Sequence, residues 1–440
     1  MMPINTSSVS LWLTALLQRG GWHEVPDEVL SPECVHKKEK TMKIAIFGFG
    51  TVGSGVYDVI KMNSDIIAKR AGKPIEIKYV LDLRDFPGNP VQEVLVHDVD
   101  IILNDPEVKI IAEVMGGINP AFDFTKRALS SGKSVCTSNK ELVAAHGAEL
   151  IELAKQHNCD YYFEASVGGG IPIIRSLCDC LVGDDILEIK GIVNGTTNYI
   201  LTRMGEDGLD FNVALKEAQD NGYAERNPAA DIEGTDAQRK AAILASLAAG
   251  AQVDCDDIPT EGIVNITAED IACAKSLGAK IKLLASIRRD DEKVSAMVAP
   301  FLVFENCQLY HVNNVFNGIL VTGNATGDVM FYGKGAGKLP TAGAVAGDII
   351  EAAKYYGLPS DIIWSREKAH MSEQGSGVQR FYVRVSDKTA MEARKALGVT
   401  AESASSKAGE VAFLTEAMSE NDFLSKIKNL EILSKIRVYD

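Results

Sequence analysis

Apolar runs alternate with helix-forming segments along the first part of the chain. Strands are predicted over 43–47, 75–81, 99–103, 110–115 and 134–137, and helices over 55–61 and 120–130. Strands that alternate with helices in this way build a parallel sheet with helices on both faces. This part of the chain is therefore predicted to be a doubly wound α/β domain.

The pattern changes towards the C-terminus. A glycine-rich loop at 333–337 precedes a predicted helix over 341–357, and a polar connector follows at 372–377. Beyond it come a strand over 380–385, a helix over 390–397, strands over 402–405 and 410–415, a helix over 421–427 and a strand over 432–438. This βαββαβ order is typical of a ferredoxin-like unit.

A glycine-rich turn directly follows the first strand. Gly48, Gly50 and Gly53 are spaced as G-x-G-x-x-G between that strand and a helix. The first glycine of such a turn allows a tight bend, the second lets a pyrophosphate approach the backbone, and the third lets the helix pack closely. The helix N-terminus then faces the phosphates. In this context the motif predicts a dinucleotide-binding domain.

The tip of the second strand carries two residues with opposite implications. Asp82 is suited to accept the ribose 2′-hydroxyl of NAD, whereas Arg84 is suited to the 2′-phosphate of NADP. The coenzyme is therefore expected to be NAD or NADP.

The segment from 222 to 240 combines a Gly-, Asn- and Pro-containing turn with several carboxylates. Thr235 is predicted to be the N-cap of a helix that continues through 241–249, so Asp236 and Lys240 stand one turn apart. An exposed ion pair at this spacing contributes only about 0.3–0.5 kcal/mol. The flanking turn and the apolar helix favour a second interpretation, a partly buried lysine whose pKa is set by desolvation and by nearby carboxylates.

Two further segments carry candidate chemistry. Lys140 follows the capping residues Ser138 and Asn139 and lies in the first turn of a helix, where the macrodipole disfavours a cation. It is either a solvent-facing lysine balanced by Glu141 or a functional cation at the ligand-binding edge of the sheet. The three glycines at 168–170 follow Glu164, and a cation site, an anion site and a plain turn are all open there.

Composition narrows the class of protein. The 440 residues suggest about three domains by length, and the net charge of −15 argues against a nucleic-acid partner. The eight cysteines include no C-x-x-C pair and are expected to be reduced thiols of a cytoplasmic protein. No segment reaches the roughly 18 consecutive apolar residues of a membrane span, and no signal peptide is predicted.

Several ordered motifs make the chain resemble the homoserine dehydrogenase family from Met42 to about Tyr356. They are GFGTVG (48–53), EVMGG (113–117), TSNKE (137–141), EASVGGGIPII (164–174), NGTTNYIL (194–201), GYAERNP (222–228), DIEGTDAQRK (231–240) and YGKGAGKLPT (332–341). The resemblance implies reduction of L-aspartate 4-semialdehyde to L-homoserine with NADPH or NADH, on the route to threonine, methionine and isoleucine.

The resemblance also implies roles for individual residues. Lys240 and Lys140 correspond to the family's two lysines, and Glu225 and Asp236 to its substrate-binding acids, with Asp236 also orienting Lys240. Thr196 and Asp231 are expected to line the same substrate pocket. The coenzyme is expected to contact Phe49, Gly50, Thr51, Val52, Gly53, Asp82, Arg84, Gly116, Thr137, Lys140 and Gly337. A structural sodium ion is expected at Glu164, Val167, Gly169 and Ile171.

The resemblance further implies a domain layout. An N-terminal extension (1–41), with Met42 as a second possible start, precedes a Rossmann-like domain (42–165) that is completed by about 316–360. A substrate-binding and dimerisation domain of α+β class (166–315) and an ACT-like ferredoxin-like module (378–440) follow, with a homodimer or homotetramer as the expected assembly. The module lacks a glycine-containing loop after its first strand, so threonine binding and a packing or oligomerisation role are both open. A fused aspartate kinase is not expected, because the 41 upstream residues are too few for a kinase domain.

Two alternative functions share the dinucleotide domain. A phosphorylating semialdehyde dehydrogenase would act through a cysteine thiolate and a nearby histidine. Cys136 instead lies within a predicted strand, and none of the seven histidines stands in an evident partner motif. A non-catalytic amino-acid sensor is the second alternative, and it would not need Lys240 or Lys140.

Overall fold

The computed structural model describes residues 41–439 apart from 359–360 and 406. The predicted extension 1–41 therefore lies, except for Thr41, outside the described residues. From Met42 onward the chain forms one compact unit. No helix in the described part of the chain is long and apolar enough to cross a membrane.

The N-terminal part contains the predicted parallel sheet. Its six strands lie in the order β3-β2-β1-β4-β5-β6. Their bounds are β1 Met42–Phe47, β2 Ile75–Leu81, β3 Leu95–Val96, β4 Val108–Glu113, β5 Ser134–Thr137 and β6 Tyr161–Tyr162. The strand order reverses beside β1, so the carboxyl ends of β1 and β4 form the edge at which such sheets bind nucleotides.

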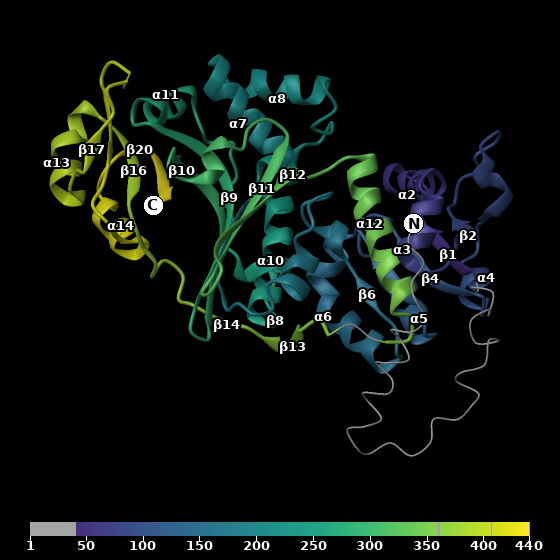
Figure 1. Ribbon diagram of the computed structural model, residues 1–440. Helices are drawn as coiled ribbons and strands as arrows, with labels where there is room; N and C mark the ends of the chain where they lie inside the picture. Colours follow the sequence, from purple (N-terminus) through teal and green to yellow (C-terminus); the bar gives the residue numbers. More distant parts are fainter. Residues whose placement is uncertain (1–40, 359–360, 406, 440) are drawn as a thin grey trace, which may run out of the picture. The chain divides into compact units, whose positions relative to one another are not determined.

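Helices cover both faces of this sheet, as predicted. Ile44 and Ile46 pack in one apolar cluster with residues of α2 (Thr51–Met62), α3 (Ser64–Ala71) and α12 (Lys338–Lys354). Ala45 and Phe47 point the other way, into the cluster that contains residues of α5 (Ala121–Ser130) and α6 (Lys140–Gln156). Although α12 is far away in sequence, it packs against α2 (Figure 1).

One predicted strand is wrong. Residues 99–103 form the short helix α4 (Val99–Leu103), and the Asp98 side chain caps it by accepting the Asp100 N–H. Val99, Ile102 and Leu103 are buried while Ile101 is exposed. This i, i+3, i+4 spacing belongs to a helix, but an apolar run of five residues cannot distinguish the two periods.

A second, mixed sheet contains most of the remaining strands. Its strands lie in the order β12-β11-β7-β9-β10-β20-β16-β18-β17. The bounds are β7 Ile186–Ile192, β9 Ala279–Asp290, β10 Lys293–Phe304, β11 Phe316–Gly323, β12 Gly327–Lys334, β16 Phe381–Ser386, β17 Ala401–Glu402, β18 Glu410–Leu414 and β20 Ile432–Tyr439. The helices α7 (Gly195–Asp207), α10 (Thr235–Ala249) and α11 (Ala268–Ser276) pack against β9.

The remaining elements are short. They are α8 Phe211–Asp220, α9 Ala229–Ile232, α13 Asp387–Leu397, α14 Glu420–Ile427, β8 Ala251–Gln252, β13 Ser365–Lys368, β14 His370–Met371, β15 Val378–Gln379 and β19 Met418–Ser419. With α13 and α14, the C-terminal strands confirm the predicted βαββαβ order.

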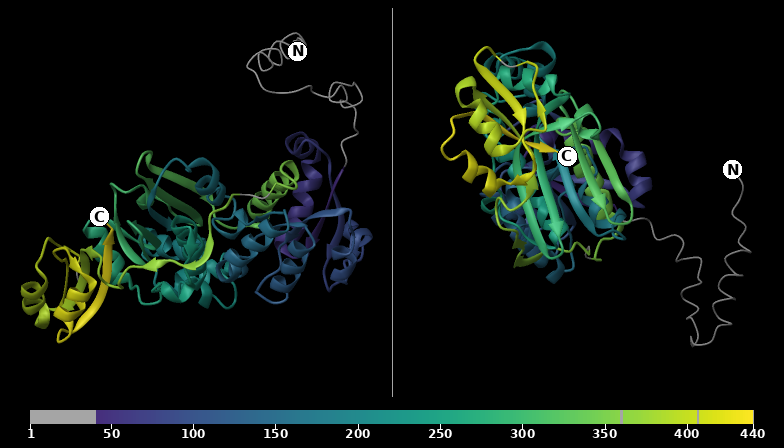
Figure 2. Two further views of the ribbon diagram at one scale, coloured as in Figure 1. Left: turned by 90° about the horizontal axis from the view of Figure 1, so that it is seen from below. Right: turned by 90° about the vertical axis from the view of Figure 1, so that its left-hand side faces the viewer.

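The strands of the C-terminal module extend the mixed sheet, so that β7, β9, β10, β11 and β12 (the central sheet) and the module form one sheet. β20 pairs in parallel with β10, with Phe301 opposite Arg437 and Val303 opposite Tyr439. Figure 2 shows the C-terminal strands beside the green strands of the central sheet. Ladder hydrogen bonds therefore join the C-terminal module to β10 of the mixed sheet.

A buried polar network strengthens this junction. The Arg384 guanidinium donates to Asp270 of α11 at 2.9 Å and to Glu410 at 2.5 Å. Asp270 is fully buried and also closes the capping box of α11 with Thr267. The α11 N-terminus is thus tied to the C-terminal module.

A second buried acid joins α12 to the segment that follows β6. Asp348 accepts the Glu164 N–H at 3.0 Å and an Arg175 N–H at 2.6 Å. Asp348→Ala would leave both donors without this acceptor, so the free energy of unfolding is expected to fall by about 1–3 kcal/mol. Urea denaturation measures the loss, and Asp58→Ala, which removes an exposed ion pair with Lys338, is the control. Equal losses in the two variants would contradict the prediction.

Candidate active site

Helix α10 presents Asp236 and Lys240 on one buried face. The Lys240 Nζ donates to Asp236 Oδ2 at 2.7 Å and to the Val193 carbonyl at 2.7 Å. The exposed fractions of Asp236 and Lys240 are only 4% and 8%, so the interpretation as an exposed ion pair is wrong. The predicted Thr235 cap is also wrong, because the N-cap is Gly234 in a left-handed conformation. A Cβ at Gly234 would lie 2.9 Å from Thr260 Cγ2.

Lys140 reaches the same carboxylate from the dinucleotide domain. Asn139 caps α6 by accepting the Leu142 N–H, which places Lys140 in the first turn as predicted. The Lys140 Nζ forms an ion pair with Asp236 Oδ1. One buried carboxylate therefore lies between two ammonium groups from separate parts of the fold.

Asn194 completes the arrangement, and sequence reasoning did not identify it. Its Nδ2 donates to Asp231 Oδ1 at 2.7 Å and to Asp236 Oδ2 at 2.8 Å. Its Oδ1 accepts the Thr197 N–H at 2.9 Å, so the same side chain caps α7. Asn194 begins the motif at 194–201, but the residue itself signals only an asparagine between an apolar strand and a helix, which predicts a cap and no further role.

The shared carboxylate shifts the pKa values of its neighbours. Burial opposes the charge of Asp236, but Lys240 and Lys140 outweigh it and hold the pKa of Asp236 well below its ordinary value. Burial, together with repulsion from Lys140, lowers the pKa of Lys240 despite the attraction of Asp236. Burial also raises the pKa of Asp231. A lysine with a lowered pKa is a better proton donor near neutral pH.

The other predicted substrate residues, Thr196 and Glu225, are more exposed than Asp236 and Lys240. The Thr196 Oγ1 donates to the Tyr223 carbonyl at 2.7 Å, which ties the start of α7 to the turn before α9. Glu225 is exposed, and its carboxylate has no hydrogen bond or ion pair with any described residue. The structure thus brings Asp231, Asp236 and both lysines together but leaves Glu225 at the surface.

The glycine turn has the geometry that its motif predicts. Gly48 is left-handed, at φ +91°. A Cβ at Gly53 would lie 1.9 Å from the Gly48 carbonyl oxygen, so only glycine fits there. Gly50 is the N-cap of α2, and nothing lies within 4 Å of a Cβ built on it. The N–H groups of Thr51 and Val52 in the first turn of α2 can therefore donate hydrogen bonds to phosphate oxygens.

Asp82 and Arg84 are joined at the tip of β2. Arg84 Nε donates to Asp82 Oδ1 at 2.9 Å and Nη2 to Oδ2 at 2.9 Å. Asp82 Oδ2 also accepts the Phe49 N–H at 2.8 Å. These contacts hold the pKa of Asp82 below its ordinary value. The Arg84 side chain is 62% exposed, so its outer donors face solvent beside the glycine turn.

His97 stands in the same place, and sequence reasoning did not identify it either. Its Nδ1 lies 2.7 Å from the Asp82 carbonyl oxygen, and its Nε2 lies 3.3 Å from Asp85. A lone histidine fifteen residues beyond Asp82 gave no signal of this contact. It adds a second basic side chain beside Arg84 at the tip of β2.

The remaining coenzyme candidates differ in accessibility. The Thr137 hydroxyl donates to the buried Glu113 carboxylate at 2.6 Å and accepts the Asn139 N–H at 2.9 Å, so it is already engaged within the protein. Burial raises the pKa of Glu113 to about 7. Gly116 is exposed, and nothing lies within 4 Å of a Cβ built on it. Gly337 is the exposed N-cap of α12.

The predicted cation segment is a tight glycine loop. The Glu164 carboxylate accepts the Ile174 and Arg175 N–H groups at 2.9 and 2.8 Å, so each of its oxygens accepts one hydrogen bond. Gly168 and Gly169 are left-handed, and a Cβ at Gly169 would lie 2.5 Å from the Gly335 carbonyl oxygen. Among the described residues, no three His, Cys, Asp or Glu side chains could together hold a metal ion. A cation here could therefore be held by the Glu164 carboxylate together with backbone carbonyls, oxygen ligands that suit a hard cation.

Comparison with known proteins agrees with this geometry. Residues 172–350 match a family model described as homoserine dehydrogenase, and residues 48–164 match its NAD binding domain. The chain is 44% identical over 322 residues to homoserine dehydrogenase of Bacillus subtilis, a match that covers 72% of this chain and 73% of that protein.

Solved structures extend the comparison to the whole fold. The crystal structure of a homoserine dehydrogenase from Thiobacillus denitrificans matches at a TM-score of 0.85 and 31% identity, over 92% of this chain and 100% of that one. A hyperthermophilic archaeal homoserine dehydrogenase mutant in complex with NADPH matches at 0.62 and 29% identity, over 72% of this chain and 98% of that one. The resemblance found in the sequence is confirmed, and the chain belongs to the homoserine dehydrogenase family of NAD(P)-dependent oxidoreductases.

Proposed function

We propose that this protein catalyses the reversible reduction of L-aspartate 4-semialdehyde to L-homoserine, a step towards threonine, methionine and isoleucine. The observation that carries the proposal is the Asp236 carboxylate held between Lys240 and Lys140. Asp236 lies in α10, and Lys140 lies directly beyond β5 of the dinucleotide domain. When bound, NAD(P)H supplies the hydride.

The protein's own residues supply the proton and hold the substrate. Lys240 donates its proton to the aldehyde oxygen as negative charge develops there, and Asp236 fixes the direction of its Nζ. Lys140 places a second positive charge near that oxygen. The substrate ammonium binds the carboxylates of Asp231 and Glu225, and Thr196 lines the same pocket.

The activity is tested by initial rates of homoserine oxidation, followed by NADPH or NADH formation. The expected result is homoserine-dependent turnover that is lost when aspartate replaces homoserine. Absence of turnover with both coenzymes, while the coenzyme still binds, would favour the alternative of a non-catalytic sensor.

For the coenzyme we propose NADP(H), because Arg84 and His97 provide basic groups where the adenosine ribose binds. The ion pair and the Phe49 N–H already engage both oxygens of Asp82, which leaves this carboxylate less able to accept a ribose hydroxyl. Asp82 then acts by holding Arg84 in place. Phe49, Gly50, Thr51, Val52 and Gly53 would surround the pyrophosphate, with Gly116, Thr137 and Gly337 nearer the nicotinamide.

Arg84→Ala tests this choice. The KM for NADP⁺ in homoserine oxidation is expected to rise about 10–100-fold, the equivalent of a lost charged hydrogen bond of about 1.5–3 kcal/mol, while the KM for NAD⁺ changes little. Initial rates with each coenzyme give the two values, and Arg70→Ala, on the exposed surface of α3, is the control. An equal rise for both coenzymes would contradict the assignment.

Three further features belong to the proposal. A sodium ion would bind Glu164 and the backbone carbonyls of Val167, Gly169 and Ile171. The 166–315 domain would form a homodimer or homotetramer, and the 378–440 module would pack against it, an idea supported by the pairing of β20 with β10. Seven described cysteines are all unpaired, which supports a cytoplasmic location.

A further inference from the structure

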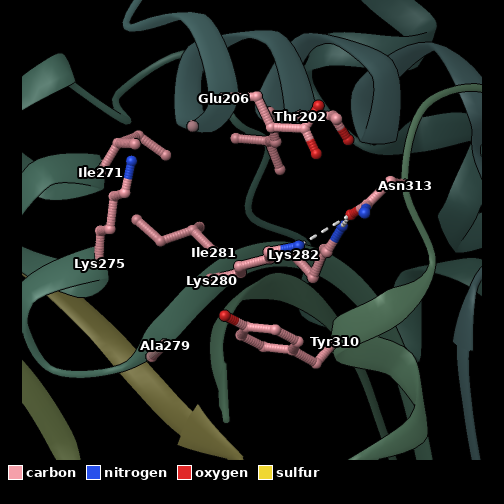
Figure 3. Close-up of a pocket in the computed structure, with 12 residues that line it drawn as sticks. Thr202, Glu206, Ile271, Lys275, Ala279, Lys280, Ile281, Lys282, Tyr310 and Asn313 are labelled. Atoms are coloured by element: carbon pink, nitrogen blue, oxygen red, sulfur yellow. Dashed lines mark hydrogen bonds between the residues drawn. The ribbon is translucent and has the colours of Figure 1, made fainter. Parts of the chain in front are cut away.

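A cavity of about 290 Å³ lies between α7, α11 and the start of β9, and none of the proposed catalytic residues lines it. This volume is near the lower end of the roughly 300–1,000 Å³ typical of small-molecule sites. In Figure 3, Thr202 and Glu206 stand on one side, and Lys280, Lys282 and Tyr310 stand opposite. The proposed reaction uses none of these residues.

The cavity has an unusual charge for this chain. It is lined by three lysines, Lys275, Lys280 and Lys282, and by one acid, Glu206, although the protein as a whole carries a net charge of −15. Within the described part of the chain, none of the three ammonium groups forms an ion pair with a carboxylate. The cavity is therefore a local site of positive charge.

Two of the lysines converge on one amide oxygen. Lys280 Nζ and Lys282 Nζ donate to Asn313 Oδ1 at 3.3 and 3.2 Å. Lys282 is only 2% exposed and also donates to Asn198 Oδ1 at 3.0 Å and to the Val312 carbonyl. Burial and the neighbouring Lys280 lower the pKa of Lys282 to about 7, against the attraction of Glu206. An anion in the cavity would relieve this repulsion.

The rest of the lining is apolar. Leu201, Ile271, Ala279 and Ile281 provide aliphatic walls, and the Lys280 ammonium lies 4.5 Å from the centre of the Tyr310 ring. A ligand that matches these walls carries a short hydrocarbon body as well as a negative charge. A phosphate or sulfate would leave the aliphatic part of the cavity without contacts.

We propose that this cavity is a binding site for a small aliphatic carboxylate, with its carboxylate at Lys280 and its hydrocarbon body against Leu201 and Ile271. The ligand is either a simple carboxylate or an aliphatic α-amino acid whose ammonium faces Glu206. Both ligands carry the carboxylate and the hydrocarbon group that the cavity would recognise.

Calorimetric titration of the full-length protein with three probes tests the site. Isovalerate carries the carboxylate alone, L-valine carries both charged groups, and isobutylamine carries the ammonium alone. We expect isovalerate, L-valine or both to bind with a Kd of about 1 mM or tighter, and isobutylamine to bind at least tenfold more weakly. Binding of isovalerate indicates the simple carboxylate, and binding of L-valine alone indicates the amino acid.

Gly205 of α7 offers a matched pair of variants. A Cβ at this position would meet only Ile271 Cγ2, at 3.9 Å, so a side chain fits without displacing the helix. Gly205→Ala is expected to retain binding, whereas Gly205→Leu fills the cavity and is expected to abolish it. Both substitutions favour the helix, and thermal unfolding verifies that both variants fold.

Removal of one charge gives an independent test. Lys280→Met keeps most of the side-chain length without the charge and is expected to weaken carboxylate binding at least tenfold, whereas Lys293→Met, at an exposed position of β10, leaves it unchanged. Absence of binding by both carboxylates, equal binding to Gly205→Leu and Gly205→Ala, or equal binding by isobutylamine and isovalerate would overturn the proposal.

Discussion

Lys240→Met is expected to lower kcat for homoserine oxidation by about 10²–10⁴-fold, the usual effect of removing a positioned acid or base. Methionine keeps most of the side-chain volume but cannot exchange a proton with the substrate oxygen. Asp236 remains paired with Lys140 in this variant, so no buried carboxylate is left alone. Initial rates at saturating coenzyme measure the effect, and coenzyme binding should be unchanged.

Lys240→Arg separates proton transfer from charge. Arginine preserves the positive charge beside Asp236, but it stays protonated throughout the working pH range. If Lys240 acts as the proton donor, this variant should be nearly as inactive as Lys240→Met. If it acts only by its charge, much of the activity should return. Thermal unfolding of both variants identifies any loss that arises from misfolding, and full activity of Lys240→Met would overturn the proposed mechanism.

Much of the dinucleotide domain could be predicted because its signals are local. The order of apolar strand, G-x-G-x-x-G turn and helix requires only neighbouring residues, and the tight contact between Gly53 and the Gly48 carbonyl explains the spacing. The position of Lys140 after a capping asparagine is equally local. These features follow from backbone geometry that a short sequence determines.

The parts that sequence did not predict depend on contacts between distant segments. Asn194 meets Asp231 and Asp236 about forty positions later, and β20 pairs with β10 more than a hundred residues before it. Neither distance leaves a periodic trace in the sequence. The strand predicted over 99–103 was wrong for another reason, because five apolar residues fit either a strand or a helical turn.

Arg384→Met is expected to lower the free energy of unfolding by about 3–5 kcal/mol, the usual cost of leaving one member of a buried ion pair alone. Asp270 has no exposed surface, so water cannot replace the guanidinium. The Tyr382 hydroxyl at 3.2 Å and the Thr267 cap remain, but neither is positively charged.

Urea denaturation followed by circular dichroism measures this loss, and Arg394→Met is the matched control. Arg394 pairs with Glu402 at 2.8 Å, but the two side chains are 38% and 49% exposed, so its removal should cost less than about 1 kcal/mol. Arg384 joins α11 to β16 and β18. In Arg384→Met, the C-terminal module should therefore separate from the other strands of the mixed sheet before the remainder of the protein unfolds. Equal losses in the two variants would show that the network contributes no more than a surface pair, and pairing of β20 with β10 would then be the main link between the C-terminal module and the rest of the mixed sheet.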